Sequence, residues 1–179
     1  MATLTSGVPA GPHVQGMREM VDVRWTGAAG LEFTYNNRTI LIDPYLSRPG
    51  KLKVFFGHLS PDITAIDNYL EKLPGNLSAI IVGHTHFDHA LDTPEFSRHF
   101  EGPLVGSHSL EILMAMHNMP GRVIVSEGDR RIELTGEAAV TMIPSVHGSV
   151  LFGLIPYMIP LVHGSALFNC RTSAIMGHK

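Results

Sequence analysis

The chain has 179 residues, of which 44% are hydrophobic, and its formal net charge is -3. This length and composition predict one domain with a sizeable core, and the absence of a basic run gives no support for a nucleic acid or a charged membrane surface as a partner. The single cysteine, Cys170, excludes an internal disulfide, and the first residues show no charged-then-apolar leader, so we expect a reducing cytoplasm and no transmembrane segment.

Short strands are predicted to begin the folded part of the chain. Residues 1–20 carry Gly and Pro with little periodicity, which predicts a loosely ordered tail before a single domain over 21–179. The predicted strands are 21–25, 31–35 and 39–42, with a tight turn at 36–38 between the last two. The first sheet is therefore expected to start antiparallel.

A helix is predicted to follow, from Ser60 to Leu73. Asp62 is a residue type that caps helices, Pro61 suits a first turn, and Pro74 with Gly75 would end the helix. An apolar stripe at helical spacing is expected to pack on the sheet, and it consists of Ile63, Ile66, Leu70 and Leu73.

The stretch that follows residues 78–83, a predicted buried strand, holds three imidazoles and a carboxylate in six positions. His84 and His86 lie two apart in an extended segment, so their rings project to the same side and can share one ion. Asp88 and His89 follow after the chain has begun to turn, which places them for a second ion. Imidazole and carboxylate ligands favour zinc, with iron and manganese as alternatives, and the sequence therefore predicts a site for one or two ions.

The segment after this loop reads as alternating helices and strands. Helices are predicted over 94–100 and 109–118, with Leu110, Leu113 and Met114 facing inward. His108 is a candidate for a place near the site, whereas the position of His117 suits a helix face. Strands are predicted at 104–105, 122–125, 131–134 and 138–143.

Residues 150–162 form an apolar stretch with two interpretations. It is too short to span a bilayer, and its prolines forbid a regular helix. It is either a loop and strand buried in the core or an apolar wall that receives an acyl or lipid-like group of a substrate. The order Val-His-Gly-Ser occurs on both sides of it, at 146–149 and 162–165, so His163 is either a further ligand or a coincidence in a His-rich chain.

The His-x-His-x-Asp-His pattern of residues 84–89 resembles the metallo-β-lactamase superfamily, and segments 25–33 and 39–44 are similar to its first sheet. The resemblance covers roughly residues 20 to 165. It is strongest to the subgroup that contains ascorbate-phosphate lactonases and N-acyl-phosphatidylethanolamine phospholipase D. It implies an α+β fold, the four-layer αβ/βα sandwich of two mixed sheets covered by helices.

The resemblance also implies roles for individual residues. His84, His86 and His147 would bind the first metal, and Asp88 and His89 the second. Asp88 would also orient the nucleophilic water and is the candidate catalytic residue. Two further acids are expected to be supporting residues: Asp43 closes a strand below the metal site, and Asp92 either holds a ligating imidazole in one tautomer or marks the entry to a helix.

The chain departs from the family pattern towards its end. No acidic residue follows Glu137, so a downstream carboxylate cannot bridge two ions, and residues 167–179 do not look like part of the family's second sheet. We therefore expect an incomplete second sheet and a chain that is truncated or divergent after about residue 165. Strand edges exposed in this way favour a homo-oligomer.

Three functions from different classes follow. The first is a metal-dependent hydrolase of a small ester, lactone or phosphodiester that uses a metal-bound hydroxide. The second is a metal-binding remnant of such an enzyme with little or no turnover. The third is a non-enzymatic assembly protein.

Overall fold

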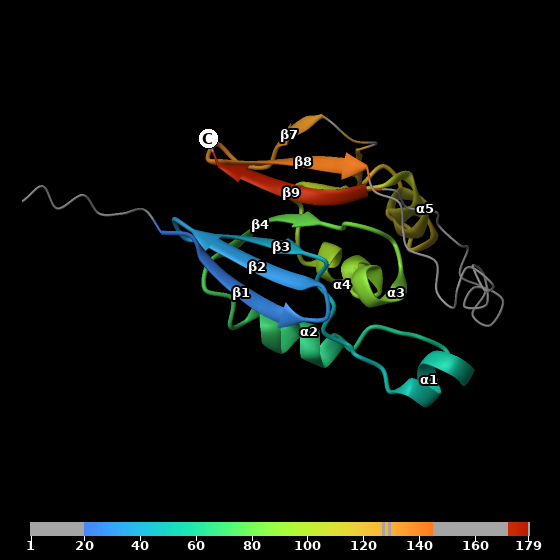
Figure 1. Ribbon diagram of the computed structural model, residues 1–179. Helices are drawn as coiled ribbons and strands as arrows, with labels where there is room; N and C mark the ends of the chain where they lie inside the picture. The colour runs from blue at the N-terminus through green and yellow to red at the C-terminus, as the bar shows by residue number, and fades with distance from the viewer. Residues whose placement is uncertain (1–19, 127, 129, 145–171, 179) are drawn as a thin grey trace, which may run out of the picture.

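The computed structural model describes residues 20–126, 128, 130–144 and 172–178 (Figure 1). Residues 1–19 of the expected tail, the apolar stretch over 150–162, His147, His163 and Cys170 lie outside the described residues. No helix in the described part of the chain is long and apolar enough to cross a membrane.

Six strands form the larger sheet in the order β1-β2-β3-β4-β5-β6. The first three are antiparallel, as predicted, and β3 to β6 run parallel. Asn36 and Asn37 form the turn between β2 and β3 with positive φ angles of 46° and 59°, a conformation that asparagine tolerates in tight hairpins. The strands are β1 Asp22–Gly27, β2 Gly30–Tyr35, β3 Arg38–Ile42, β4 Asn76–Ile81, β5 Leu104–Gly106 and β6 Ile124–Val125.

The second sheet is small and antiparallel, in the order β7-β8-β9. It consists of β7 Arg131–Glu133, β8 Ala138–Pro144 and β9 Thr172–His178. The expectation that residues 167–179 take no part in this sheet is wrong, because β9 pairs along the whole of β8. Strand pairing uses backbone N–H and C=O groups, so a segment without a clear apolar alternation can still join a sheet.

Five helices are described: α1 Lys51–Phe56, α2 Ile63–Leu70, α3 Phe87–Ala90, α4 Thr93–Arg98 and α5 His108–Met116. The carboxylate of Asp62 caps α2 by accepting a hydrogen bond from the Ala65 N–H at 3.0 Å. Two details of the prediction were wrong: Pro61 precedes the cap, and Ile63 faces solvent, so the buried stripe begins at Ile66. Helix α1 was not predicted, and none of its residues is buried.

The core lies on both faces of the larger sheet. Leu41 and Ile80 pack with the helices, whereas their neighbours Ile40 and Ile81 pack against the second sheet. This alternation follows from the two-residue period of a strand, and it explains why β3 and β4 are apolar throughout. Figure 1 shows the resulting layers, with α2 and α4 below the larger sheet and β7 to β9 above it. The expected two-sheet sandwich is confirmed, and the described residues supply three of its four layers.

The parallel strands β3, β4 and β5 determine where the polar loops meet. Their carboxyl ends lie at one edge of the sheet, where the Asp43 N–H donates to the Ile81 carbonyl at 2.9 Å and the Val82 N–H to the Val105 carbonyl at 2.9 Å. Segments that leave this edge are therefore brought together although they are far apart in the sequence.

Candidate metal centre

The histidine loop leaves β4 and turns at once into a short helix. His86 is the N-cap of α3, and the Ala90 N–H donates to its carbonyl at 2.9 Å. Asp88 and His89 thus stand on the first turn of a helix, which directs their side chains back towards the start of the loop. The turn that the sequence predicted after His86 is confirmed.

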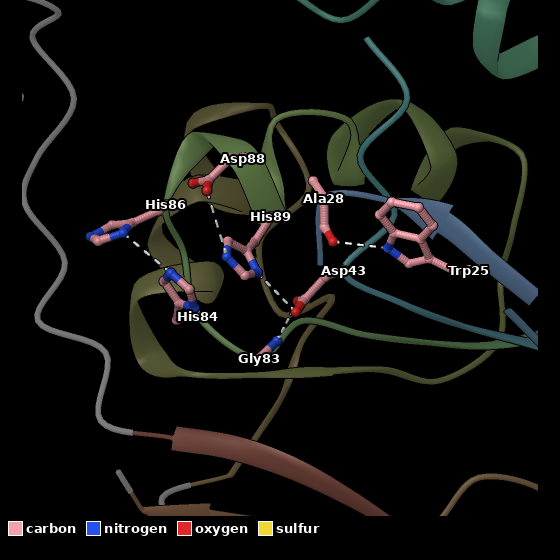
Figure 2. Close-up of polar contacts among 8 residues, drawn as sticks. All are labelled: Trp25, Ala28, Asp43, Gly83, His84, His86, Asp88 and His89. Carbon is pink, nitrogen blue, oxygen red and sulfur yellow. Dashed lines mark hydrogen bonds and ion pairs between the residues drawn. The ribbon is translucent and has the colours of Figure 1, made fainter. Parts of the chain in front are cut away.

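Three side chains of this loop form a compact ligand set. His84, Asp88 and His89 each offer one ligand atom, and these atoms all lie within 4.8 Å of one another. The rings of His84 and His89 are 3.7 Å apart between centroids, and Asp88 Oδ2 lies 3.8 Å from His89 Nε2. Figure 2 shows the three side chains pointing toward one another.

His86 stands at the outer side of this set (Figure 2). Its Nδ1 is 3.2 Å from His84 Nε2, so the fourth predicted ligand of the loop adjoins the other three. Two nitrogen donors and a carboxylate suit zinc, iron or manganese, so the residues present fit a divalent metal ion. The division into a first and a second ion stays a prediction, because His147 lies outside the described residues.

Asp43 braces the loop from the end of β3. Its Oδ2 accepts a hydrogen bond from His89 Nδ1 at 2.8 Å, and its Oδ1 accepts one from the Gly83 N–H at 2.6 Å. An acceptor on Nδ1 assigns the proton to that nitrogen, which leaves the lone pair of His89 Nε2 on the side of Asp88. The carboxylate therefore selects the tautomer of His89 that can bind a metal.

Charge at this brace favours a cation. Burial alone would lower the pKa of His89, but the hydrogen bond from His89 to Asp43 and the negative charges of Asp43 and Asp88 outweigh it, so the pKa is raised. The field that stabilises a proton on the imidazole also attracts a metal ion, which would replace that proton.

Gly83 is required for the close approach of the loop to Asp43. A Cβ atom built at Gly83 would lie 3.1 Å from Asp43 Oδ2, which is tighter than an ordinary contact. A side chain here would require the Asp43 carboxylate to shift by a few tenths of an ångström.

Asp92 binds the loop after β3 and not a histidine of the described cluster. Its buried carboxylate accepts hydrogen bonds from the Leu46 N–H at 2.5 Å, the Ser47 N–H at 2.8 Å and the Ser47 hydroxyl. It also precedes α4 as the N-cap residue, though without a side-chain cap bond. Of its two predicted roles, the one at a helix entry matches its position before α4, whereas the described hydrogen bond to an imidazole is made by Asp43.

Two further contacts around the loop had no signal in the sequence. Tyr45 packs edge-on against Phe87 with ring centroids 6.2 Å apart, and burial together with the charges of Asp88 and Asp92 raises the pKa of its phenol. Thr85 and Ser107 share a hydrogen bond of 3.1 Å between their hydroxyls, which ties the loop to the start of α5.

The remaining histidine candidate is not part of the described cluster. His108 follows Ser107 directly, but its side chain is 70% exposed and its Nδ1 contacts Glu111 Oε2 at 2.8 Å. A surface hydrogen bond within one helix accounts for this contact. His163, like His147, lies outside the described residues.

The chain resembles known proteins in sequence and in fold. Residues 31–155 match the family model described as the metallo-beta-lactamase superfamily. The chain is 25% identical over 125 residues to a UPF0173 metal-dependent hydrolase of Ruegeria sp.. This match covers 70% of the chain and 48% of the relative. It is 30% identical over 137 residues to a UPF0173 metal-dependent hydrolase of Anaeromyxobacter sp., across 74% of this chain and 44% of the relative.

Among solved structures, Igni18, a metallo hydrolase from Ignicoccus hospitalis, matches with a TM-score of 0.58 at 16% identity. The match covers 88% of this chain and 56% of that one, and at this identity it supports the fold alone. The chain spans about half the length of the curated relatives it matches.

Proposed function

Because the chain belongs to the metallo-β-lactamase superfamily, we propose that it is a metal-dependent hydrolase whose metal is held by His84, Asp88 and His89. The observation that carries the proposal is the convergence of these three side chains at the end of β4, braced by Asp43. The names of its relatives, which are metal-dependent hydrolases, support the same class of reaction.

The proposed chemistry divides between the metal and the protein. A bound zinc, iron or manganese ion would polarise a carbonyl or phosphoryl oxygen and lower the pKa of a coordinated water. The residues hold and orient the reactants: Asp43 keeps the Nε2 lone pair of His89 available, and His84 supplies a second nitrogen. The side chain of Asp88 is 47% exposed, so one of its oxygens can orient an attacking water and accept its proton.

The substrate class is a narrower proposal. An ester, lactone or phosphodiester offers the carbonyl or phosphoryl centre that this donor set can activate. The resemblance to lactonases and to the phospholipase D subgroup favours lactones and phosphodiesters within that range. An acyl or lipid-like substrate group, a cytoplasmic location and a homo-oligomer remain predictions, which rest on the apolar residues 150–162, the single cysteine and the expected strand edges.

The test combines metal content with turnover. We expect the purified chain to contain zinc, iron or manganese by mass spectrometry and to hydrolyse at least one member of a panel of chromogenic esters, lactones and phosphodiesters. His89→Ala should lower both readouts, since it removes one of three ligands. His108→Ala is the matched control, because it removes an exposed imidazole that contacts only a neighbouring glutamate in the described structure.

The outcomes are distinguishable. Metal that binds equally well in the His89→Ala chain would show that the ion lies elsewhere. Bound metal without turnover on the whole panel would favour a metal-binding remnant, and a chain that takes up no metal would favour an assembly protein.

A further inference from the structure

Helix α1 exposes a group of large apolar side chains. Its side chains Leu52, Phe55 and Phe56 are 78%, 59% and 85% exposed, and no residue of the helix is buried. Figure 1 shows α1 standing apart from both sheets. Large exposed apolar side chains in a group mark an interaction surface, whereas single ones need no explanation.

These three side chains share one face. At about 100° per residue, Leu52, Phe55 and Phe56 fall within an arc of about 100°. The half-buried Val54 lies on the opposite side of the helix. Lys51 and Lys53 lie on the two sides of the apolar face. Their long side chains can therefore extend to any surface that this face contacts.

The charge around α1 has one sign. Residues 44–61 contain Arg48, Lys51 and Lys53 and no acidic residue, although the whole chain carries a net charge of -3. Neither lysine forms an ion pair with another described residue. The net charge of the whole chain therefore does not reflect the basic and aromatic character of residues 44–61.

The segment is held in place although α1 itself packs against little. Arg48 donates to the Thr26 carbonyl, and Ser47 is bound to Asp92, so the chain is anchored just before the helix. A hollow of about 360 Å³, lined in part by Lys53 and Ile63, separates α1 from the start of α2. The apolar face of α1 is thus exposed, while the segment just before the helix is hydrogen-bonded to the domain.

We infer that α1 is an interfacial anchor that rests on an anionic lipid surface, with Leu52, Phe55 and Phe56 at the acyl boundary and Lys51 and Lys53 at the headgroups. Aromatic and leucine side chains on one face with lysines beside them are what such a surface binds. A second copy fits less well, because two such faces would bring lysines together and six residues supply little of the roughly 800 Å² per partner of a stable interface.

The test places one thiol on this face. In a Cys170→Ser background, Leu52→Cys is labelled with a polar maleimide, alone and with vesicles of phosphatidylcholine with or without phosphatidylserine. We expect the anionic vesicles to slow labelling about tenfold, and the neutral ones to have little effect. Met116→Cys, an equally simple change at an exposed methionine of α5, should label at an unchanged rate in all three conditions.

A charge reversal completes the experiment. Adding Lys51→Glu and Lys53→Glu to the Leu52→Cys chain should restore fast labelling on anionic vesicles, with an unchanged circular dichroism spectrum because α1 buries no residue. Slow labelling without lipid would overturn the inference: if it depends on protein concentration, a second copy covers the face, and if not, the chain itself does. Equal protection by neutral vesicles, or by anionic vesicles after charge reversal, would also overturn it.

Discussion

Asp43 and His89 are joined by a hydrogen bond of 2.8 Å between Oδ2 and Nδ1, although 46 residues separate them in the sequence. Asp43 directly follows β3 and His89 belongs to α3, which follows β4, so the bond joins segments that leave two neighbouring parallel strands. Because the same carboxylate also receives the Gly83 N–H, it fixes the first and last parts of the histidine loop at once. The geometry of the proposed ligands therefore depends on a residue outside the loop.

The brace predicts a loss of metal affinity in the Asp43→Asn chain. An amide has one acceptor oxygen where the carboxylate has two, so it cannot accept both from Gly83 and from His89. We expect zinc to bind about ten- to a hundredfold more weakly, as measured by isothermal titration with competing chelator.

Asp67→Asn is the matched control, because that carboxylate is half-exposed and lies outside the cluster. Its zinc affinity should be that of the wild type. An Asp43→Asn chain with unchanged affinity would show that the brace does not position a ligand.

Asp92 should affect stability more than metal binding. Asp92→Ala leaves the partly buried N–H groups of Leu46 and Ser47 without their acceptor, and we expect the free energy of unfolding to fall by about 2 kcal/mol in urea titrations. Zinc affinity of the folded protein should change less than in Asp43→Asn. A larger loss of zinc affinity in Asp92→Ala than in Asp43→Asn would instead indicate that Asp92 holds a ligating imidazole.

Removing the metal should lower the melting temperature. An ion present at a hundredfold its dissociation constant stabilises the folded state by about 2.7 kcal/mol, which for a chain of this size corresponds to a shift on the order of 5–10 °C. Dialysis against a chelator should produce this loss, and added zinc should reverse it. In the His89→Ala chain the chelator should have little effect, and a wild-type melting curve that ignores the chelator would contradict the site.

Tyr69 should make the protein sensitive to alkaline pH. Burial and the hydrogen bond to the buried Glu32 raise the pKa of this phenol far above its usual value. Below about pH 10 the phenol of Tyr69 is protonated in both the folded and the unfolded chain. Above that pH the unfolded chain loses this proton, whereas the folded chain keeps it. The unfolded state then binds fewer protons, so the free energy of unfolding falls by up to about 1.4 kcal/mol per pH unit.

The comparison is with Tyr69→Phe, which keeps the ring and leaves Glu32 paired with Arg24. Urea titrations between about pH 9 and about pH 11 should give a shallower loss of stability in the variant than in the wild type. Parallel curves would show that Tyr69 ionises equally in both states.

The fold was predictable where local patterns and tertiary packing agree. The apolar runs of β3 and β4 and the capped start of α2 were visible because burial on both faces and a cap leave a signature in a few neighbouring residues. Helix α1 was missed because its apolar side chains face outward, so no buried stripe distinguishes it. Strand β9 was missed because its partner is chosen by backbone hydrogen bonds.

The sequence by itself determined the donor types of the candidate site and their local order, because the spacing of residues 84–89 limits where a short segment can direct its side chains. Only the tertiary structure decided which acid supports them. Asp43 and Asp92 are both plausible in the sequence, but the parallel arrangement of β3 and β4 brings Asp43 to His89, while packing of α4 against the loop after β3 gives Asp92 to Ser47. Such contacts arise from the packing of distant segments, which no local spacing encodes.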